Sequence, residues 1–170
     1  MLIFIIGFMA SGKSYWARRL AEKTKTQSID LDQLIEKKEK MSLDDLIQRK
    51  GWDYFRQKEQ EILKKIQKKN ITFIAVGGGT PCYFDNLIWM QSQGKVIYLK
   101  TPVELLLRRL QSDPNQRPLL RGKTSEQLAA FVANLLSERE EYYQKADFIV
   151  SQNTDNQAVE NIILSYLKIT

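Results

Sequence analysis

The feature that most constrains this chain is a short loop of small residues directly after its first apolar run. Residues 7–14 read GFMASGKS and match the pattern G-x-x-x-x-G-K-[ST]. The loop follows the apolar run LIFIIG and opens the stretch SYWARRLAEK, whose composition favours a helix. Backbone N–H groups at a helix N-terminus bind phosphate. This order therefore predicts a strand, a loop that binds a nucleoside triphosphate, and a helix, with a plain glycine turn as the disfavoured alternative.

Strand-like and helix-like segments alternate along the chain. Five apolar or β-branched runs are expected to be strands, at 2–7, 27–32, 71–79, 95–100 and 146–151. A stretch of helical composition follows each of the first four, which is typical of a parallel sheet with helices on both faces. We therefore expect an α/β protein with one domain over residues 1–170.

Composition excludes several kinds of chemistry. The chain has no histidine and one cysteine, Cys82, so Ser-His and Cys-His catalysis, zinc sites and internal disulfides are excluded. No signal peptide or membrane span is recognised, and a cytoplasmic protein is expected. The net charge is +6, but residues 36–69 mix eleven basic with seven acidic residues, which favours a solvated helix face over a nucleic-acid surface.

Two carboxylates and an arginine–glutamate pair are candidates for holding a phosphate acceptor. Asp30 and Asp32 are expected at the end of a strand, on the same side, where one serves Mg²⁺ and the other a substrate hydroxyl. The alternative is that one of them caps a helix that begins near residue 33. Arg56 and Glu59 are three residues apart on an expected helix, so the carboxylate can hold the guanidinium toward a ligand, or the pair is an ordinary surface ion pair.

A polar segment at 112–123 contains two prolines and a glycine, and loops of this length are often lids. Thr124 and Gln127 form a capping-box pair that begins the next helix. The apolar stripe of that helix continues to Arg139 and Tyr143. An arginine on a buried face requires an anion, unless it reaches solvent or pairs with a structural carboxylate.

Together these motifs resemble the shikimate kinase family over most of the chain. They are the phosphate loop, Asp-x-Asp at 30–32, G-x-x-x-F-R-x-x-E at 51–59, the triple glycine at 77–79, R-P-L-L at 117–120 and R-x-x-x-Y at 139–143. The resemblance implies a three-layer α/β/α fold with a five-stranded parallel sheet in the order 2-3-1-4-5. It also implies Mg²⁺-dependent transfer of the γ-phosphate of ATP to the 3-hydroxyl of shikimate, by a protein that is a monomer in most members of the family.

The resemblance also assigns site residues by position. Lys13, Asp32 and Arg117 would be catalytic, with Arg117 on a lid at about 112–124, and Ser14 and Asp30 would serve the metal. The acceptor, held partly by a helical region at about 32–62, would contact Asp32, Arg56, Gly78, Gly79 and Arg139. The nucleotide would contact Ala10, Ser11, Gly12, Lys13, Ser14, Tyr15, Arg109 and Arg117.

The chain departs from the family pattern in three places. Ala10 stands where the family usually has glycine, and its methyl group would crowd the β-phosphate if its φ angle were positive. Tyr15 replaces a common threonine, and SQNTDNQ near the C-terminus lacks the arginine or proline often found beside adenine. Alternative functions are another small-molecule kinase such as a gluconate kinase, a non-catalytic nucleotide-binding module, and a nucleic-acid-associated protein.

Overall fold

The centre of the fold is a five-stranded sheet whose strands are all parallel, in the order β2-β3-β1-β4-β5. The computed structural model describes residues 1–170 except 68–69, 113–121, 154 and 170. The strands are β1 Leu2–Ile6, β2 Gln27–Asp30, β3 Thr72–Ala75, β4 Gly94–Lys100 and β5 Phe148–Ser151. Each expected run overlaps one strand, and the predicted fold class and strand order are confirmed.

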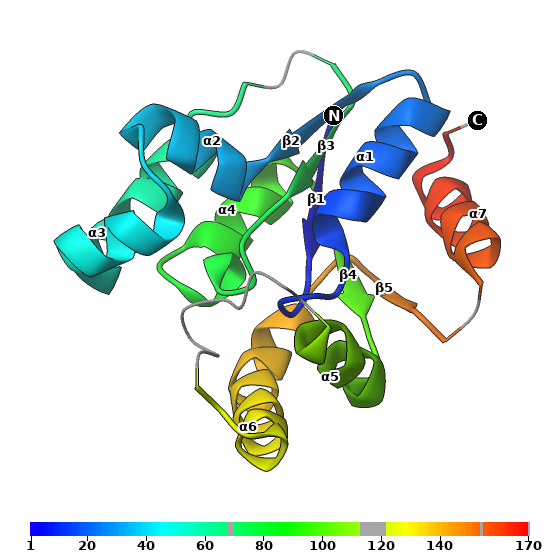
Figure 1. Ribbon diagram of the computed structural model, residues 1–170. Helices are drawn as coiled ribbons and strands as arrows, with labels where there is room; N and C mark the ends of the chain where they lie inside the picture. The colour runs from blue at the N-terminus through cyan, green and yellow to red at the C-terminus, as the bar shows by residue number, and fades with distance from the viewer. Residues whose placement is uncertain (68–69, 113–121, 154, 170) are drawn as a thin grey trace.

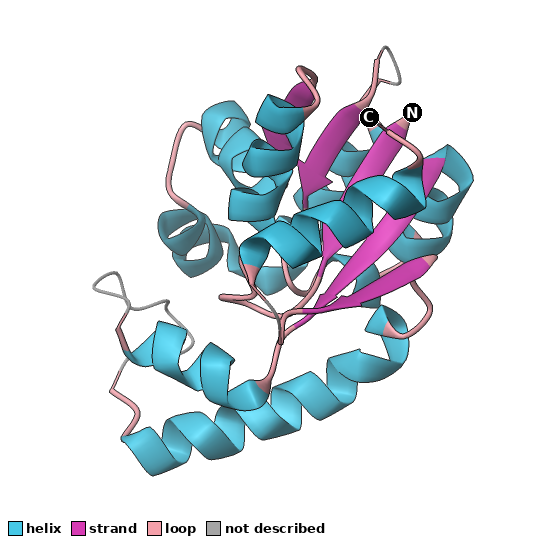
Figure 2. Ribbon diagram, turned by 90° about the vertical axis from the view of Figure 1, so that its right-hand side faces the viewer, coloured by secondary structure: helices cyan, strands magenta, loops and turns pink. Residues whose placement is uncertain are grey.

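Helices cover both faces of the sheet, as Figures 1 and 2 show. They are α1 Lys13–Lys23, α2 Leu31–Glu39, α3 Leu43–Lys64, α4 Asn86–Gln93, α5 Val103–Gln111, α6 Ser125–Tyr143 and α7 Asn156–Leu167, with a short 3₁₀ helix η1 Thr80–Cys82. Side chains of β1 alternate between two apolar clusters. Phe4 and Ile6 pack with α2 to α6, and Ile3 and Ile5 pack with α1 and α7.

The end of β2 differs from the expected strand over 27–32. The strand stops at Asp30, which is the N-cap of α2, and its Oδ1 accepts hydrogen bonds from the N–H groups of Asp32 (3.0 Å) and Gln33 (3.3 Å). These bonds begin the helix at Leu31, two residues earlier than expected. The prediction that Asp30 and Asp32 share one side of a strand is therefore wrong, and the capping alternative is confirmed for Asp30.

Three strand ends lie side by side at one edge of the sheet. In the register of the sheet, Ala75 at the end of β3 is opposite both Ile5 of β1 and Asp30 of β2. The phosphate loop, Asp30 and the triple glycine all follow these strand ends. Ligands of parallel α/β sheets bind outside the carboxyl ends of the strands, so this edge is where a site is expected. Among the described helices, none has the length and apolar content that a membrane-spanning helix needs.

Candidate active site

The loop between β1 and α1 is held in a fixed shape by bonds to its own backbone. Gly12 is the N-cap of α1 and has a φ of 89°, a left-handed conformation that glycine adopts without strain. Lys13 Nζ donates a 2.8 Å hydrogen bond to the carbonyl of Phe8 across the loop. Gln152, beyond β5, donates a 2.6 Å bond to the carbonyl of Ser11. The N-terminus of α1 therefore faces an ordered loop, which suits phosphate binding.

Ala10 is one of the few non-glycine residues with a positive φ angle, at 59°. Its carbonyl accepts a 3.0 Å hydrogen bond from Nη1 of Arg109, on α5. Burial lowers the pKa of Arg109, because the guanidinium is partly removed from water. The structure thus places Arg109 against the phosphate loop and gives Ala10 the conformation in which its methyl group is unfavourable.

Two oxygen groups suitable for a metal lie together beside the loop. Ser14 Oγ donates a 2.5 Å hydrogen bond to Oδ2 of Asp30, whose other oxygen caps α2. The described residues contain no group of three or more acidic, cysteine or histidine side chains that would bind a metal by themselves. A pair of oxygens next to a phosphate site fits Mg²⁺, because this ion keeps several waters and binds substrate phosphates.

A second cavity, of about 160 Å³, lies next to the loop, and it contains the two arginines expected to contact the acceptor. Arg56 comes from α3 and Arg139 from α6. The helix α3 bends at Gly51, which has a φ of 81° and a ψ of 168°, so residues before and after the bend reach the same cavity. The residues that line this cavity are Met9, Asp32, Leu43, Asp44, Ile47, Trp52, Phe55, Arg56, Glu59, Gly77, Gly78, Gly79 and Arg139.

Arg56 is buried and held by a carboxylate from the next turn of its helix. Its Nη1 lies 2.7 Å from Oε2 of Glu59, and Oε1 of Glu59 accepts a 2.6 Å hydrogen bond from the hydroxyl of Thr80. The Nε of Arg56 is buried and has no hydrogen-bond partner within the described residues. A buried cation with an unused donor suits an anionic ligand. The surface-pair alternative is wrong, since Glu59 is 0% exposed.

The triple glycine is required because a charged side chain lies against each residue. A Cβ atom added to Gly79 would lie 2.6 Å from Nη2 of Arg56, and one added to Gly77 would lie 2.8 Å from Glu59 Oε1. At Gly78 the Cβ would lie 3.3 Å from Nη1 of Arg139. A larger residue would displace these groups, so the turn brings backbone close to the polar wall of the cavity.

The cavity with the arginines meets the cavity of the phosphate loop. The phosphate cavity has a volume of about 260 Å³ and is lined by residues of the loop and the start of α1, including Lys13 and Ser14, and by Arg109 of α5. Asp32 and Gly78 line both cavities. A group transferred between two ligands would pass at these residues. This arrangement is what a phosphotransferase needs, because donor and acceptor must lie in line and close together.

Arg139 reaches the cavity that contains Arg56 from α6. Its guanidinium carbon lies 5.9 Å from the centre of the Phe8 ring in the phosphate loop. The capping box of Thr124 and Gln127 begins α6 as expected. Leu128 and Val132 on the stripe before Arg139 are buried. The expected stripe therefore does carry the arginine from the core of the protein to the cavity.

Arg117 and Tyr15 are two further residues that were expected to contact the nucleotide. Arg117 and most of the expected lid lie outside the described residues. Tyr15 is exposed, and its Oη accepts a 3.4 Å hydrogen bond from Asn156 at the start of α7. Tyr15 thus lies between α1 and α7, at the edge of the phosphate cavity that it lines.

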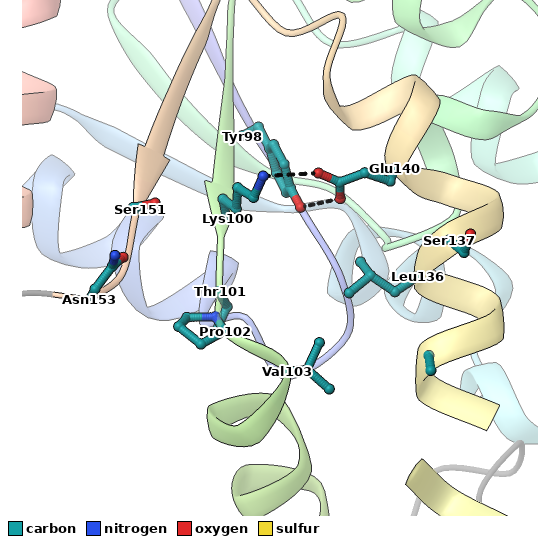
Figure 3. Close-up of a pocket in the computed structure, with 11 residues that line it drawn as sticks. Tyr98, Lys100, Thr101, Pro102, Val103, Leu136, Ser137, Glu140, Ser151 and Asn153 are labelled. Carbon is teal, nitrogen blue, oxygen red and sulfur yellow. Dashed lines mark hydrogen bonds and ion pairs between the residues drawn. The ribbon is translucent and has the colours of Figure 1, made fainter. Parts of the chain in front are cut away.

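A larger cavity, of about 700 Å³, lies on another side of α6. Figure 3 shows Lys100 and Tyr98 of β4 directed toward Glu140 of α6 in this cavity. It contains none of the phosphate-loop residues, glycines 77–79 or the two arginines. Volume therefore does not identify the reactive site, and the chemistry favours the two smaller, connected cavities.

Several cavity residues were not singled out from the sequence. Asp44 and Ile47 of the first part of α3, Trp52 after the bend, and Met9 in the loop line the arginine cavity. The spacing of Leu43, Ile47 and Trp52 beside Gly51 was the available signal, but a helical apolar stripe is usually read as core. Gln152 was also missed, because a single glutamine in a polar stretch carries no pattern.

Comparison with known proteins agrees with this geometry. A sequence model described as shikimate kinase matches residues 9–169. The shikimate kinase of Azobacteroides pseudotrichonymphae is 39% identical to this chain, over 95% of the chain and 96% of that protein. The crystal structure of shikimate kinase from Bacteroides thetaiotaomicron has a TM-score of 0.92 and 30% identity, covering 99% of this chain and 98% of that one.

A third comparison concerns a structure with a ligand. Shikimate kinase from Acinetobacter baumannii, solved in complex with shikimate, has a TM-score of 0.87 and 28% identity, covering 98% of this chain and 93% of that one. Sequence and structure thus agree over nearly the whole chain. The chain belongs to the shikimate kinase family.

Proposed function

We propose that this protein transfers the γ-phosphate of ATP to the 3-hydroxyl of shikimate, giving ADP and shikimate 3-phosphate for aromatic amino acid biosynthesis. The observation that carries the proposal is the convergence of Arg56 and Arg139, 83 positions apart (139 minus 56), on one cavity that opens to the phosphate loop. Two guanidinium groups in one small cavity suit a carboxylate. The A. baumannii relative was solved with shikimate, which is a carboxylic acid.

The nucleotide is assigned to the loop and its neighbours. Backbone N–H groups around Gly12 would surround the phosphates, and Lys13 would neutralise charge on them. Arg109, which lies against the loop, would pack near the base. The full proposed set is Ala10, Ser11, Gly12, Lys13, Ser14, Tyr15, Arg109 and Arg117.

Ser14 and Asp30 are the proposed metal-binding residues, because their oxygens are adjacent and close to the phosphate cavity. Mg²⁺ bound there would neutralise charge on the β- and γ-phosphates. The Ser14–Asp30 hydrogen bond holds the two oxygens next to each other. The cap that Asp30 provides for α2 fixes the carboxylate in place.

Asp32 is proposed to accept a hydrogen bond from the 3-hydroxyl and to orient it toward the phosphate, since its side chain lines both cavities. Arg56 and Arg139 would hold the carboxylate, and Gly78 and Gly79 would contact the ring. We further propose a monomeric cytoplasmic enzyme with one domain over 1–170, an acceptor region at about 32–62, and a lid at about 112–124 whose Arg117 contacts the transferred phosphate.

A coupled assay of ADP release tests this proposal. Shikimate, quinate, gluconate and nucleoside monophosphates would each be offered as acceptor with MgATP. We expect shikimate to exceed every other acceptor in kcat/KM by at least about a hundredfold, because a poorly matched acceptor leaves buried polar groups of the site unpaired. Comparable turnover of gluconate or quinate would instead assign another small-molecule kinase activity, and no acceptor-dependent turnover would favour a nucleotide-binding module.

A further inference from the structure

Tyr143 is the last residue of α6 and lies one helical turn after Arg139. Its side chain is 0% exposed, and its Oη donates a 2.6 Å hydrogen bond to the carbonyl oxygen of Gly78. Gly78 is one of the two residues that line both the acceptor cavity and the phosphate cavity. The tyrosine hydroxyl is therefore bonded to the backbone at the point where the two ligands would meet.

This bond holds the carbonyl of the middle glycine, whereas the carbonyls of Gly77 and Gly79 accept hydrogen bonds from the N–H groups of Thr80 and Cys82. In a trans peptide the C=O of one residue and the N–H of the next point in opposite directions. When Tyr143 holds the Gly78 carbonyl, the direction of the Gly79 N–H is also set. Glycine has no Cβ to restrict its backbone, so a turn of three glycines depends on such bonds for its orientation.

The tyrosine ring is itself held in place. It packs on Tyr98 of β4, with ring centroids 5.0 Å apart and an angle of 34° between the planes. Tyr98 donates a 2.7 Å hydrogen bond to Oε2 of Glu140, and Lys100 lies 3.5 Å from the other carboxylate oxygen, as Figure 3 shows. Burial raises the pKa of Tyr143, so its hydroxyl stays protonated and remains a donor.

We propose that Tyr143 is a positioning residue for the acceptor: its hydroxyl sets the Gly78–Gly79 peptide plane against which the acceptor binds, on the same helix that presents Arg139. This inference rests on the proposed acceptor site. It assigns a role in acceptor binding to a side chain that belongs to the hydrophobic core and lines neither cavity.

The first experiment compares Tyr143→Phe with Tyr98→Phe in the full-length protein. Both substitutions remove one buried phenol hydrogen bond, but only the first removes a bond to the glycine turn. We expect kcat/KM for shikimate to fall about tenfold in Tyr143→Phe, the usual scale of one buried hydrogen bond, and KM for ATP to change less than about twofold. Tyr98→Phe should keep both constants within about twofold of wild type.

An equal fall in both variants, or no fall in Tyr143→Phe, would overturn the proposal, since a merely structural role predicts a similar loss of stability and no selective effect on shikimate. Wild-type turnover of shikimate is measured in the same series. If the wild-type protein does not phosphorylate shikimate, the proposed function fails; if only the Tyr143→Phe effect is absent, the positioning role fails.

The second experiment observes the peptide directly by NMR. The chain contains 8 glycines, and its only Gly–Gly peptide bonds are 77–78 and 78–79. Protein labelled with [1-¹³C, ¹⁵N]glycine therefore gives two Gly–Gly carbonyl–amide signals, one of which reports the Gly78 carbonyl. Tyr143→Phe should shift that carbonyl upfield and leave the Gly77 carbonyl nearly unchanged.

If Tyr143→Phe does not fold, 3-fluorotyrosine at position 143 replaces it, because this residue keeps the ring and is a stronger donor. The Gly78 carbonyl should then move downfield. A Gly78 signal that stays in place in either variant would contradict the assigned bond and with it the positioning role.

Discussion

The phosphate loop and the acceptor cavity lie side by side, but they are constructed in different ways. The loop is one continuous segment between β1 and α1, and its binding groups are mainly backbone N–H donors and the N-terminus of α1. The acceptor cavity combines side chains of α2, α3 and α6 with the glycine turn after β3. A local motif thus determines the proposed nucleotide site, while tertiary packing determines the proposed acceptor site.

The difference also appears in how charge is held. In the loop, Lys13 is at the first position of an ordinary helix. In the acceptor cavity, Arg56 is almost completely buried, and its charge is balanced by the fully buried Glu59. Removing water strengthens electrostatic interactions, so the acceptor site gains selectivity but depends on its internal partners for stability.

The largest expected effect is the loss of activity when Lys13 of the phosphate loop is replaced. Lys13→Ala removes the cation proposed to neutralise the phosphates, and we expect kcat/KM to fall by about a thousandfold or more with either substrate. The loss should persist when shikimate and ATP are both saturating, as measured by ADP release. Retention of more than about a tenth of wild-type kcat would show that the loop does not act as proposed.

On the acceptor side, Arg139→Ala should raise KM for shikimate about a hundredfold, because a charge-assisted pair of hydrogen bonds is removed. KM for ATP should stay within about threefold. Arg49→Ala, at an exposed position of α3, is the matched control and should resemble wild type. Equal increases in both KM values would mean that Arg139 does not distinguish the two sites.

The buried ion pair provides a stability test. Glu59→Gln leaves the charge of Arg56 without its counterion, and we expect a loss of about 3 kcal/mol in the free energy of unfolding. Glu61→Gln, nearby on α3 at a carboxylate that is 42% exposed, should cost less than about 0.5 kcal/mol. Urea denaturation of both variants measures the difference, and similar values would contradict the burial argument.

In the loop, Ala10→Gly should stabilise the fold by about 1 kcal/mol, since φ is 59° and glycine adopts this conformation without strain. Ala133→Gly, at an exposed position inside α6, is the opposite control and should destabilise by about 1 kcal/mol. Thermal unfolding distinguishes the signs. A destabilised Ala10→Gly protein would mean that the methyl group contributes packing that outweighs the strain.

The smallest effect concerns Cys82, next to the glycine turn, whose N–H donates to the carbonyl of Gly79. Burial raises the pKa of its thiol to about 11, so the reactive thiolate is scarce at pH 8 and increases as the pH approaches that value. Iodoacetamide should therefore alkylate Cys82 at least about tenfold more slowly than glutathione in the same tube. Equal rates at pH 8 would indicate that the turn opens.

The same comparison explains which parts were predictable. The strand order and the phosphate loop follow from a local motif, strand–helix alternation and family resemblance. The Arg56–Glu59 pair was also predictable, because an i,i+3 spacing places both on one helix face. The cap at Asp30 was predicted only as an alternative, since a carboxylate after a strand fits either a strand end or a helix start.

Contacts between distant segments were not predictable. The bond from Gln152 to Ser11 and the bond from Tyr143 to Gly78 join residues 141 and 65 positions apart. The positive φ of Ala10 depends on the loop as a whole and on Arg109 from α5. A single sequence does not give the relative position of two such segments. Their position is determined by how they pack on the common sheet.

The account depends on the proposal that Arg56 and Arg139 together recognise one carboxylate. The most direct test compares shikimate with methyl shikimate, which keeps the hydroxyls but has no carboxylate charge, in wild type and in Arg139→Ala by ADP release. We predict that the wild-type protein prefers shikimate about a thousandfold in kcat/KM and that Arg139→Ala loses most of this preference. Equal turnover of acid and ester by the wild-type protein would contradict the account.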